Sequence, residues 1–393
     1  MDKTFFCIFG GGGIRGAAYT GAIKAINELN LNITGYAGSS IGAVVAGLVV
    51  FNYSPDEIQN IFDNINFEFF KDINLNFGKD FAISKGNNFY EWMKNKIEAK
   101  FYEDNKEIKE DEILPPVRFK DIEKELIIFT ADLTTSKLYE FSKEKTPNAE
   151  IAHAIRISVG MPGLYAPIFS ENECLADGDL LKSMPLSKAS DTISVKKEKI
   201  LEFRLENNET KKKILNTIEY LNAVYDTISG TASDFVIKTY KNLDKYDFIK
   251  INTENVSVAD FMINKEKKHK IANIGYETTI EYFKNFYPEK CRRLSNIYKK
   301  LYNEIKVITF LIKNRELKEA RFEIVSAASN LLNAVKIIDD KVVNLITEAK
   351  NIFNENYIIK KSIFGKKPVL MDNNKVLNSL KEAENYLYDK LNA

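Results

Sequence analysis

A serine between two glycines, at the junction of a predicted strand and a predicted helix, is the most constraining feature of this chain. Residues 38–42 read Gly-Ser-Ser-Ile-Gly, and the apolar run 41–51 that follows predicts a buried helix. Gly38 and Gly42 lack the Cβ atoms that would clash in a sharp strand-to-helix turn, and such a turn exposes the hydroxyl of Ser40 as a nucleophile. The alternative is a tight turn whose serine caps a core helix. The pentapeptide alone leaves both interpretations open.

A glycine-rich loop precedes this turn. Residues 10–16 read Gly-Gly-Gly-Gly-Ile-Arg-Gly, between a predicted strand at 4–9 and a predicted helix at 17–29. The backbone N–H groups of such a loop bind an anion, either a phosphate or the oxyanion of a tetrahedral intermediate. The spacing Gly11, Gly13, Gly16 also fits a dinucleotide-binding motif, but no acidic strand end follows at the expected distance. Nucleotide binding is therefore the weaker alternative.

These two strand–loop–helix units predict an α/β fold with a parallel sheet. Later strands are predicted at 126–131, 138–141, 201–205 and 248–251, and a helix at 151–159. The pattern of apolar residues changes at about residue 288. Residues 291–354 carry an almost continuous helical period, 364–368 interrupt it, and a last helix is predicted at 374–391. We expect a catalytic domain over residues 1–287 and a helical C-terminal module over 288–393.

An aspartate supplies the remaining group that acyl transfer requires. Asp177 begins the sequence Asp-Gly-Asp after a short apolar segment, although an ordinary Asp-Gly turn is the simpler alternative for that motif. The chain has two histidines, and neither is placed as the triad of an α/β-hydrolase requires. His269 lies in the charged run 265–270, typical of a solvated helix face, and His153 lies within a predicted packed helix. The sequence therefore favours a Ser-Asp dyad with Asp177 as the direct base.

Composition excludes several other classes of protein. The net charge of +1 creates no field that favours nucleic acid. The three cysteines lie far apart without a CxxC pair, which predicts reduced thiols and no zinc or disulfide framework. The N-terminus lacks the pattern of a Sec signal, and the run 41–51 is too short for a bilayer span of roughly 20 residues. We expect a cytoplasmic protein, with peripheral membrane contact and export by a specialised secretion system left open.

In order and spacing, these motifs resemble the patatin-like phospholipase family. The segments between them also match: 118–122 leads into the strand at 126–131, and 161–167 resembles the family's Pro-Gly-aromatic-x-Pro segment. Asp260-Phe261 with Gly275-Tyr276 resembles its closing segment, so the similarity spans about residues 4–287. The resemblance implies a three-layer sandwich with a mostly parallel central sheet. It also implies a serine acyl hydrolase that cleaves phospholipids, lysophospholipids or other acyl lipids through an acyl-enzyme, with no metal or other cofactor.

By this resemblance, Ser40 is the nucleophile and Asp177 the base. The implied oxyanion hole consists of the backbone N–H groups of Gly11, Gly12 and Gly13, aided by Arg15. For Arg15 the simpler alternative is an ordinary surface arginine. The chain departs from the family at two positions: Gly10 stands where an acidic residue is frequent, and Asp179 where the family has Gly or Ala. We expect the charge of Asp179 to make Asp177 harder to ionise. Neither departure removes a required catalytic group, so activity is still expected.

Several features leave alternatives open. Asp179 and the helical module suggest, as the alternative function, an inert scaffold that binds lipid or protein. The phenylalanines of the segment 62–81 form either a lid over an acyl-chain groove or an ordinary core. The pairs Lys299-Lys300, Lys360-Lys361 and Lys366-Lys367 either contact an anionic membrane or, the favoured interpretation, form a solvated face. The expected partner is an acyl-lipid substrate; the sequence specifies neither its head group nor an activating protein.

Overall fold

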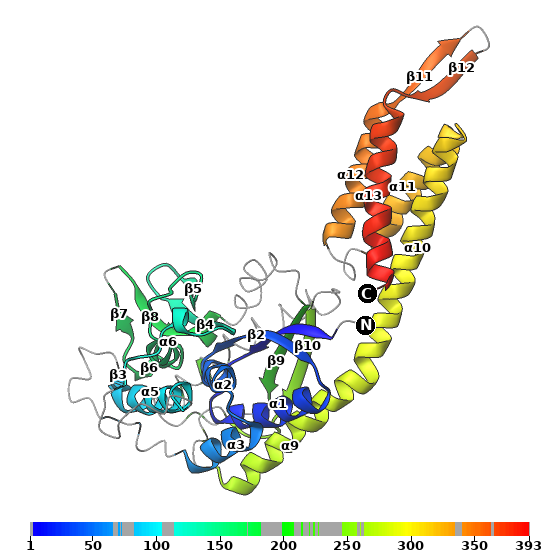
Figure 1. Ribbon diagram of the computed structural model, residues 1–393. Coiled ribbons are helices and arrows are strands. Elements are labelled where there is room, and N and C mark those ends of the chain that lie inside the picture. Colours follow the sequence, from blue (N-terminus) through cyan, green and yellow to red (C-terminus); the bar gives the residue numbers. More distant parts are fainter. Residues whose placement is uncertain are drawn as a thin grey trace. The chain divides into compact units, whose positions relative to one another are not determined.

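The computed structural model describes residues 3–65, 70, 72, 82–103, 114–170, 172–181, 199–207, 214, 220, 223–224, 227, 246–257, 260, 263–334, 340–362 and 365–392. The chain divides into two compact units (Figure 1). The larger unit comprises residues 3–238 and 246–282, and the smaller unit residues 283–393 together with 1–2 and 239–245. The predicted division into a catalytic domain and a module at residue 288 stays a prediction.

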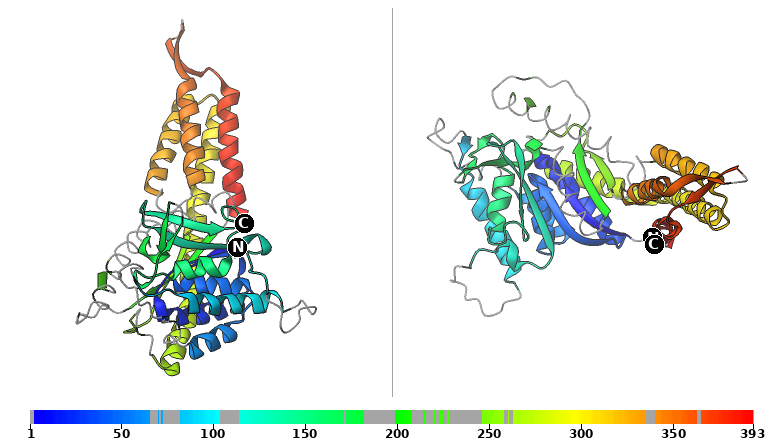
Figure 2. Two further views of the ribbon diagram at one scale, coloured as in Figure 1. Left: turned by 90° about the vertical axis from the view of Figure 1, so that its left-hand side faces the viewer. Right: turned by 90° about the horizontal axis from the view of Figure 1, so that it is seen from above.

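The larger unit contains an eight-stranded, mostly parallel sheet with the order β10-β9-β1-β2-β4-β8-β7, in which β5 also pairs with β4. The strands are β1 (Thr4–Phe9), β2 (Asn32–Ser39), β4 (Glu125–Asp132), β5 (Lys137–Ser142), β7 (Ile168–Phe169), β8 (Cys174–Asp177), β9 (Lys199–Glu206) and β10 (Tyr246–Asn252). The strands from β10 to β4 are parallel, and β5 and β8 run antiparallel to β4. Helices lie on both sides of the sheet (Figures 1 and 2), which confirms the predicted three-layer α/β fold.

The larger unit contains the helices α1 (Ala18–Glu28), α2 (Ile41–Val50), α3 (Pro55–Asn64), α5 (Asn87–Phe101), α6 (Ile151–Ser158) and α9 (Lys265–Glu281). Three of them, α1, α2 and α6, lie where the sequence predicts them, and the sequence assigns no bounds to the other three. Every residue of α2 is buried, as its unbroken apolar sequence predicts. A single 3-10 turn, Gly13–Ala17, precedes α1, so the predicted helix at 17–29 starts one residue later than expected. A short parallel pair, β3 (Ala82–Ser84) with β6 (Gly163–Tyr165), lies outside the main sheet.

Two glycines allow α1 and α9 to pack with their backbones in contact. A Cβ atom at Gly21 would lie 1.7 Å from the carbonyl oxygen of Ala272, and a Cβ atom at Gly275 would lie 2.0 Å from that of Ala18. Neither distance is compatible with a side chain, because real Cβ atoms do not approach backbone below about 3 Å. The two glycines therefore fix α9 against the first helix of the fold.

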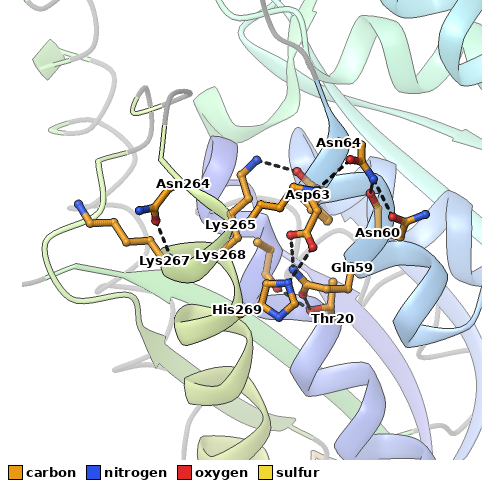
Figure 3. Close-up of polar contacts among 12 residues, drawn as sticks. Thr20, Gln59, Asn60, Asp63, Asn64, Asn264, Lys265, Lys267, Lys268 and His269 are labelled. Carbon is orange, nitrogen blue, oxygen red and sulfur yellow. Dashed lines mark hydrogen bonds and ion pairs between the residues drawn. The ribbon is translucent and has the colours of Figure 1, made fainter.

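The N-terminal end of α9 is attached to α3 by polar contacts (Figure 3). Lys268 donates to the carbonyl oxygen of Phe62 at 2.8 Å, and His269 Nε2 lies 2.7 Å from Asp63 Oδ2. Lys265 reaches Asn64 Oδ1 at 3.2 Å. His269 is exposed, as expected, whereas Lys268 is buried. The charged run at 265–270 is thus only partly a solvated face, because one of its lysines is used to attach α3.

The smaller unit is a bundle of long helices with a β-hairpin. The helices are α10 (Tyr287–Lys313), α11 (Leu317–Ala334), α12 (Asp340–Asn356) and α13 (Asn373–Asn392). One apolar cluster fills the bundle, with Leu301, Ile308, Ile346 and Phe353 among its buried members. The hairpin consists of β11 (Tyr357–Ser362) and β12 (Gly365–Leu370), which are antiparallel. The sequence predicts the helices and their interruption, but not these strands.

Within these described ranges, no helix combines the length and apolarity needed to cross a membrane.

The contact between α1 and α9 generates a first prediction. Gly275→Ala forces a methyl group into the backbone of α1, so we expect a loss of about 1–3 kcal/mol in the free energy of unfolding. The intrinsic helix preference of alanine acts in the opposite direction by at most about 1 kcal/mol. Denaturant unfolding followed by circular dichroism measures the change. Asn273→Ala, on the exposed side of the same helix, is the control and should shift stability by no more than about 0.5 kcal/mol. Equal stability of the two variants would contradict the packing argument.

Candidate active site

Ser40 sits in a strained turn between β2 and α2. Its φ of 51° and ψ of −128° lie in a region that side-chain-bearing residues rarely adopt. The turn is possible because both flanking residues are glycines. A Cβ atom at Gly38 would lie 2.2 Å from the carbonyl oxygen of Gly42, and one at Gly42 would lie 2.0 Å from that of Phe9. The backbone geometry is that of a nucleophile elbow.

The hydroxyl of Ser40 donates a hydrogen bond to Asp177 Oδ2 at 2.9 Å. Asp177 is the last residue of β8, whose pairing with β4 places it beside Thr130. Gly178 permits this close approach, because a Cβ atom there would lie 2.1 Å from the carbonyl oxygen of Phe129. Asp177 is fully buried and Ser40 is 8% exposed. A serine and a carboxylate that meet in this way are the minimum set for nucleophilic catalysis with a direct base.

Ser158 is a supporting residue that the sequence analysis did not single out for the site. Its hydroxyl accepts a hydrogen bond from the backbone N–H of Ser40 at 2.9 Å and donates one to the carbonyl oxygen of Phe129 at 2.6 Å. It therefore ties the elbow to β4 from the C-terminal end of α6. No pattern in the segment 155–158, which reads Ile-Arg-Ile-Ser, distinguishes this serine as part of the site.

Neither histidine belongs to this site. His153 lies against the ring of Tyr90, edge to face, with ring centroids 6.0 Å apart. His269 is paired with Asp63 on α3, as Figure 3 shows. The structure thus brings Ser40 and Asp177 together without a histidine between them.

The glycine-rich loop lies beside the elbow. Gly12 and Gly13 adopt positive φ values of 155° and 58°, which favour glycine. Arg15 is buried, and its Nε donates to the carbonyl oxygen of Gly12 at 3.1 Å, so it shapes the loop rather than lying on the surface. Gly13 lines the same pocket as Ser40 and Asp177. In the described part of the chain, the backbone N–H groups of Gly12 and Gly13 have no hydrogen-bond acceptor.

Asp179 connects all three parts of the site. Its Oδ1 accepts hydrogen bonds from the backbone N–H of Gly11 at 3.0 Å and from the hydroxyl of Ser39 at 3.1 Å. Its own backbone N–H donates to Asp177 Oδ1 at 2.8 Å. Asp179 is fully buried. The sequence predicts only an effect of its charge; the structure adds that it holds the loop, the elbow and the Asp-Gly turn together, and that it occupies one of the three expected oxyanion donors.

A pocket that opens to solvent extends from Ser40 and Asp177. Its walls are almost entirely apolar and come from α2, α3, α5 and the segment 159–165. Phe62 and Phe70 contribute to these walls, whereas Phe67, Phe69, Phe77 and Phe81 lie outside the described residues. The pocket has the chemistry to accept a hydrocarbon chain next to the serine hydroxyl.

In the part of the chain that the structure describes, no three or more histidine, cysteine, aspartate or glutamate side chains cluster in a way that could hold a metal ion.

The chain is similar in sequence to several known proteins. Residues 7–190 match the family model of patatin-like phospholipases. Uncharacterized protein R571 of Acanthamoeba polyphaga mimivirus is 28% identical over 278 residues, which cover 68% of this chain and 90% of that protein. A probable lipid hydrolase, 463L, of Invertebrate iridescent virus 6 is 24% identical over 188 residues, 46% of this chain and 62% of the viral protein.

Similarity of fold extends over most of the chain. The crystal structure of VipD from Legionella pneumophila aligns with a TM-score of 0.51 at 16% sequence identity and covers 98% of this chain and 91% of VipD. The match of residues 7–190 identifies a patatin-like phospholipase domain in this chain, and the comparisons support a lipid hydrolase at the level of that family.

Proposed function

We propose that this protein hydrolyses carboxylic ester bonds of phospholipids or lysophospholipids, with Ser40 as the nucleophile and Asp177 as the base. The observation that carries the proposal is the 2.9 Å hydrogen bond from Ser40 Oγ to Asp177 Oδ2 at the edge of an apolar pocket. The family assignment and the similarity to a probable lipid hydrolase support a lipid as the substrate.

The reaction proceeds in two halves. Asp177 removes the proton of Ser40 as Oγ attacks the ester carbonyl, and it returns that proton to the leaving alcohol when the tetrahedral intermediate collapses to the acyl-enzyme. Water then attacks the acyl-enzyme with Asp177 again as the base, which releases the fatty acid and restores the serine. Because Asp177 Oδ1 accepts the N–H of Asp179, the other oxygen remains directed at the serine.

Backbone N–H groups of the glycine loop stabilise the oxyanion in this proposal. Gly12 and Gly13 are the assigned donors, while Gly11 donates to Asp179 and so holds the loop in place. The carbonyl of Gly12 and the N–H of Gly13 belong to one planar peptide unit and point in opposite directions. By binding the Gly12 carbonyl, Arg15 therefore fixes the direction of the Gly13 N–H, which makes Arg15 a positioning residue. The N-terminal end of α2 adds a favourable dipole.

The first test of the proposal is the removal of the nucleophile. Wild type and Ser40→Ala are incubated with mixed phospholipid vesicles and EDTA, and released fatty acids are measured by mass spectrometry. We expect Ser40→Ala to lower release by about 10³-fold or more while its thermal unfolding stays unchanged. A fluorophosphonate should label wild type and the neighbouring variant Ser39→Ala, but not Ser40→Ala. Normal turnover by Ser40→Ala would rule out Ser40 as the nucleophile. No fatty-acid release and no labelling of wild type would favour the inert scaffold instead.

The second test concerns the two aspartates. Asp177→Asn should lower kcat by about 10²–10⁴-fold, because an amide cannot take the proton of Ser40. Asp179→Asn keeps an oxygen that can accept from Gly11 and Ser39, so it should lower kcat far less than Asp177→Asn does. Equal losses of kcat in the two variants would contradict the assignment of Asp177 as the base.

The third test concerns the acyl pocket. Leu164 lines the pocket and is only partly buried, so Leu164→Trp narrows it with little effect on the core. We expect kcat/KM for long-chain esters to fall about tenfold or more, while that for a short-chain ester changes little. Leu133→Trp, at an exposed position outside the pocket, is the matched control and should leave the ratio of the two substrates unchanged. An unchanged ratio in Leu164→Trp would mean that the acyl chain binds elsewhere.

A further inference from the structure

The hairpin of the smaller unit carries two pairs of lysines that face each other across its strands. In the register of β11 and β12, Lys360 lies opposite Lys367 and Lys361 lies opposite Lys366. We call these four residues the lysine ribbon. Figures 1 and 2 show the hairpin extending past the ends of α12 and α13, between which it is inserted in the chain.

This arrangement places positive charge on both faces of the hairpin. Residues directly opposite in an antiparallel pair share a face, with Cβ atoms about 4.5–5.5 Å apart, and successive residues alternate between faces. Each face therefore has one lysine pair. Like charges in this position destabilise a hairpin. The two lysines within each pair of this hairpin therefore repel each other, and a bound anionic surface would reduce that repulsion.

The charge of the lysine ribbon is not neutralised by its surroundings. All four lysines are exposed, and none forms an ion pair or a side-chain hydrogen bond with the described residues of the chain. The segment 357–371 contains no aspartate or glutamate. The region thus presents a local charge of +4 on a chain whose formal net charge is +1.

The base of the hairpin is anchored to the bundle. Tyr357 and Leu370, which are opposite each other, pack against the apolar cluster of the four helices. The guanidinium of Arg321 lies over the ring of Tyr357 at 4.8 Å, and the backbone N–H of Met371 donates to the carbonyl of Asn356 at 2.9 Å. An isolated two-stranded hairpin is only marginally stable. The anchored base therefore supports the projecting lysines.

Exposed apolar side chains accompany the charge. Ile359 is 59% exposed and, by strand alternation, shares a face with Lys361. Met371, just beyond β12, is 64% exposed. Lysines next to exposed aliphatic side chains match a bilayer surface, where the ammonium groups meet lipid phosphates and the aliphatic groups enter the interface. A purely polyanionic partner such as DNA would gain nothing from the isoleucine.

We propose that the lysine ribbon docks the protein on membrane surfaces that contain anionic phospholipids. The proposal rests on the proposed function in one respect, because docking would bring the enzyme to its lipid substrate. The attraction is electrostatic and acts within about one Debye length of the surface, so it weakens as ionic strength rises.

Sedimentation with vesicles tests this docking surface on the full chain that carries Ser40→Ala. The vesicles contain phosphatidylcholine alone or phosphatidylcholine with phosphatidylserine. We expect binding only to the second kind, and a loss of binding in high salt. Each lysine held at an anionic surface strengthens binding about fivefold, so Lys361→Gln with Lys366→Gln should weaken it about 25-fold. Lys360→Gln with Lys367→Gln should have a similar effect. Both double variants should stay folded, because each removes a repulsive pair.

The matched control is Lys299→Gln with Lys300→Gln, which removes the same charge from exposed positions on α10. It should change binding by less than about fivefold. Equal binding to both kinds of vesicle, equal losses in the control and the ribbon variants, or binding to a DNA duplex without binding to phosphatidylserine vesicles would overturn the proposal. Because Ser40→Ala is used, the result does not depend on hydrolysis: failure of docking leaves the proposed mechanism intact, and failure of hydrolysis leaves the docking result intact.

Discussion

The hydrogen bond between Ser40 and Asp177 joins two turns that are 137 residues apart in the chain, and the arrangement of the larger unit makes that bond possible. Three glycines remove the side chains that would keep the turns apart: Gly38 and Gly42 within the elbow, and Gly178 where the chain passes β4. The strain at Ser40 is compensated locally, since Ser158 accepts its backbone N–H and connects it to β4. The site is thus a product of close backbone packing at the edge of the sheet.

Asp179 connects the glycine loop to the elbow of the same site. A buried carboxylate is costly unless it is hydrogen-bonded, and this one accepts from Gly11 and Ser39. The contact gives a rigid connection between the loop and the elbow, and it removes Gly11 from the donors that face the pocket. This contact requires a carboxylate at a position where the resemblance to the family leads us to expect Gly or Ala. The apolar pocket beside it supplies the other requirement of a lipid hydrolase, a dry wall for the acyl chain.

The smaller unit is organised around one apolar cluster. Its four helices bury one apolar cluster with helical spacing, which is why their sequences predict them well. Among the described residues of the hairpin between α12 and α13, Tyr357 and Leu370 pack against the apolar cluster, and two pairs of lysines face each other across the strands. Natural hairpins avoid opposed like charges, so this segment is better suited to a surface that supplies negative charge than to water alone.

The sequence by itself predicted the strands and helices around the two glycine motifs, an elbow at Ser40 and Asp177 as the candidate base, because periodicity and glycine spacing are local properties of the chain. It did not predict α5 or the hairpin of β11 and β12. It also argued against a catalytic role for His153 and His269, since neither lies at the position in the sequence that an α/β-hydrolase triad requires. Only the tertiary structure decided that Gly11 donates to Asp179, that Ser158 supports the elbow, and that Lys268 is buried against α3. These contacts join segments 118 to 206 residues apart, and their partners depend on how sheet and helices pack, which no local pattern records.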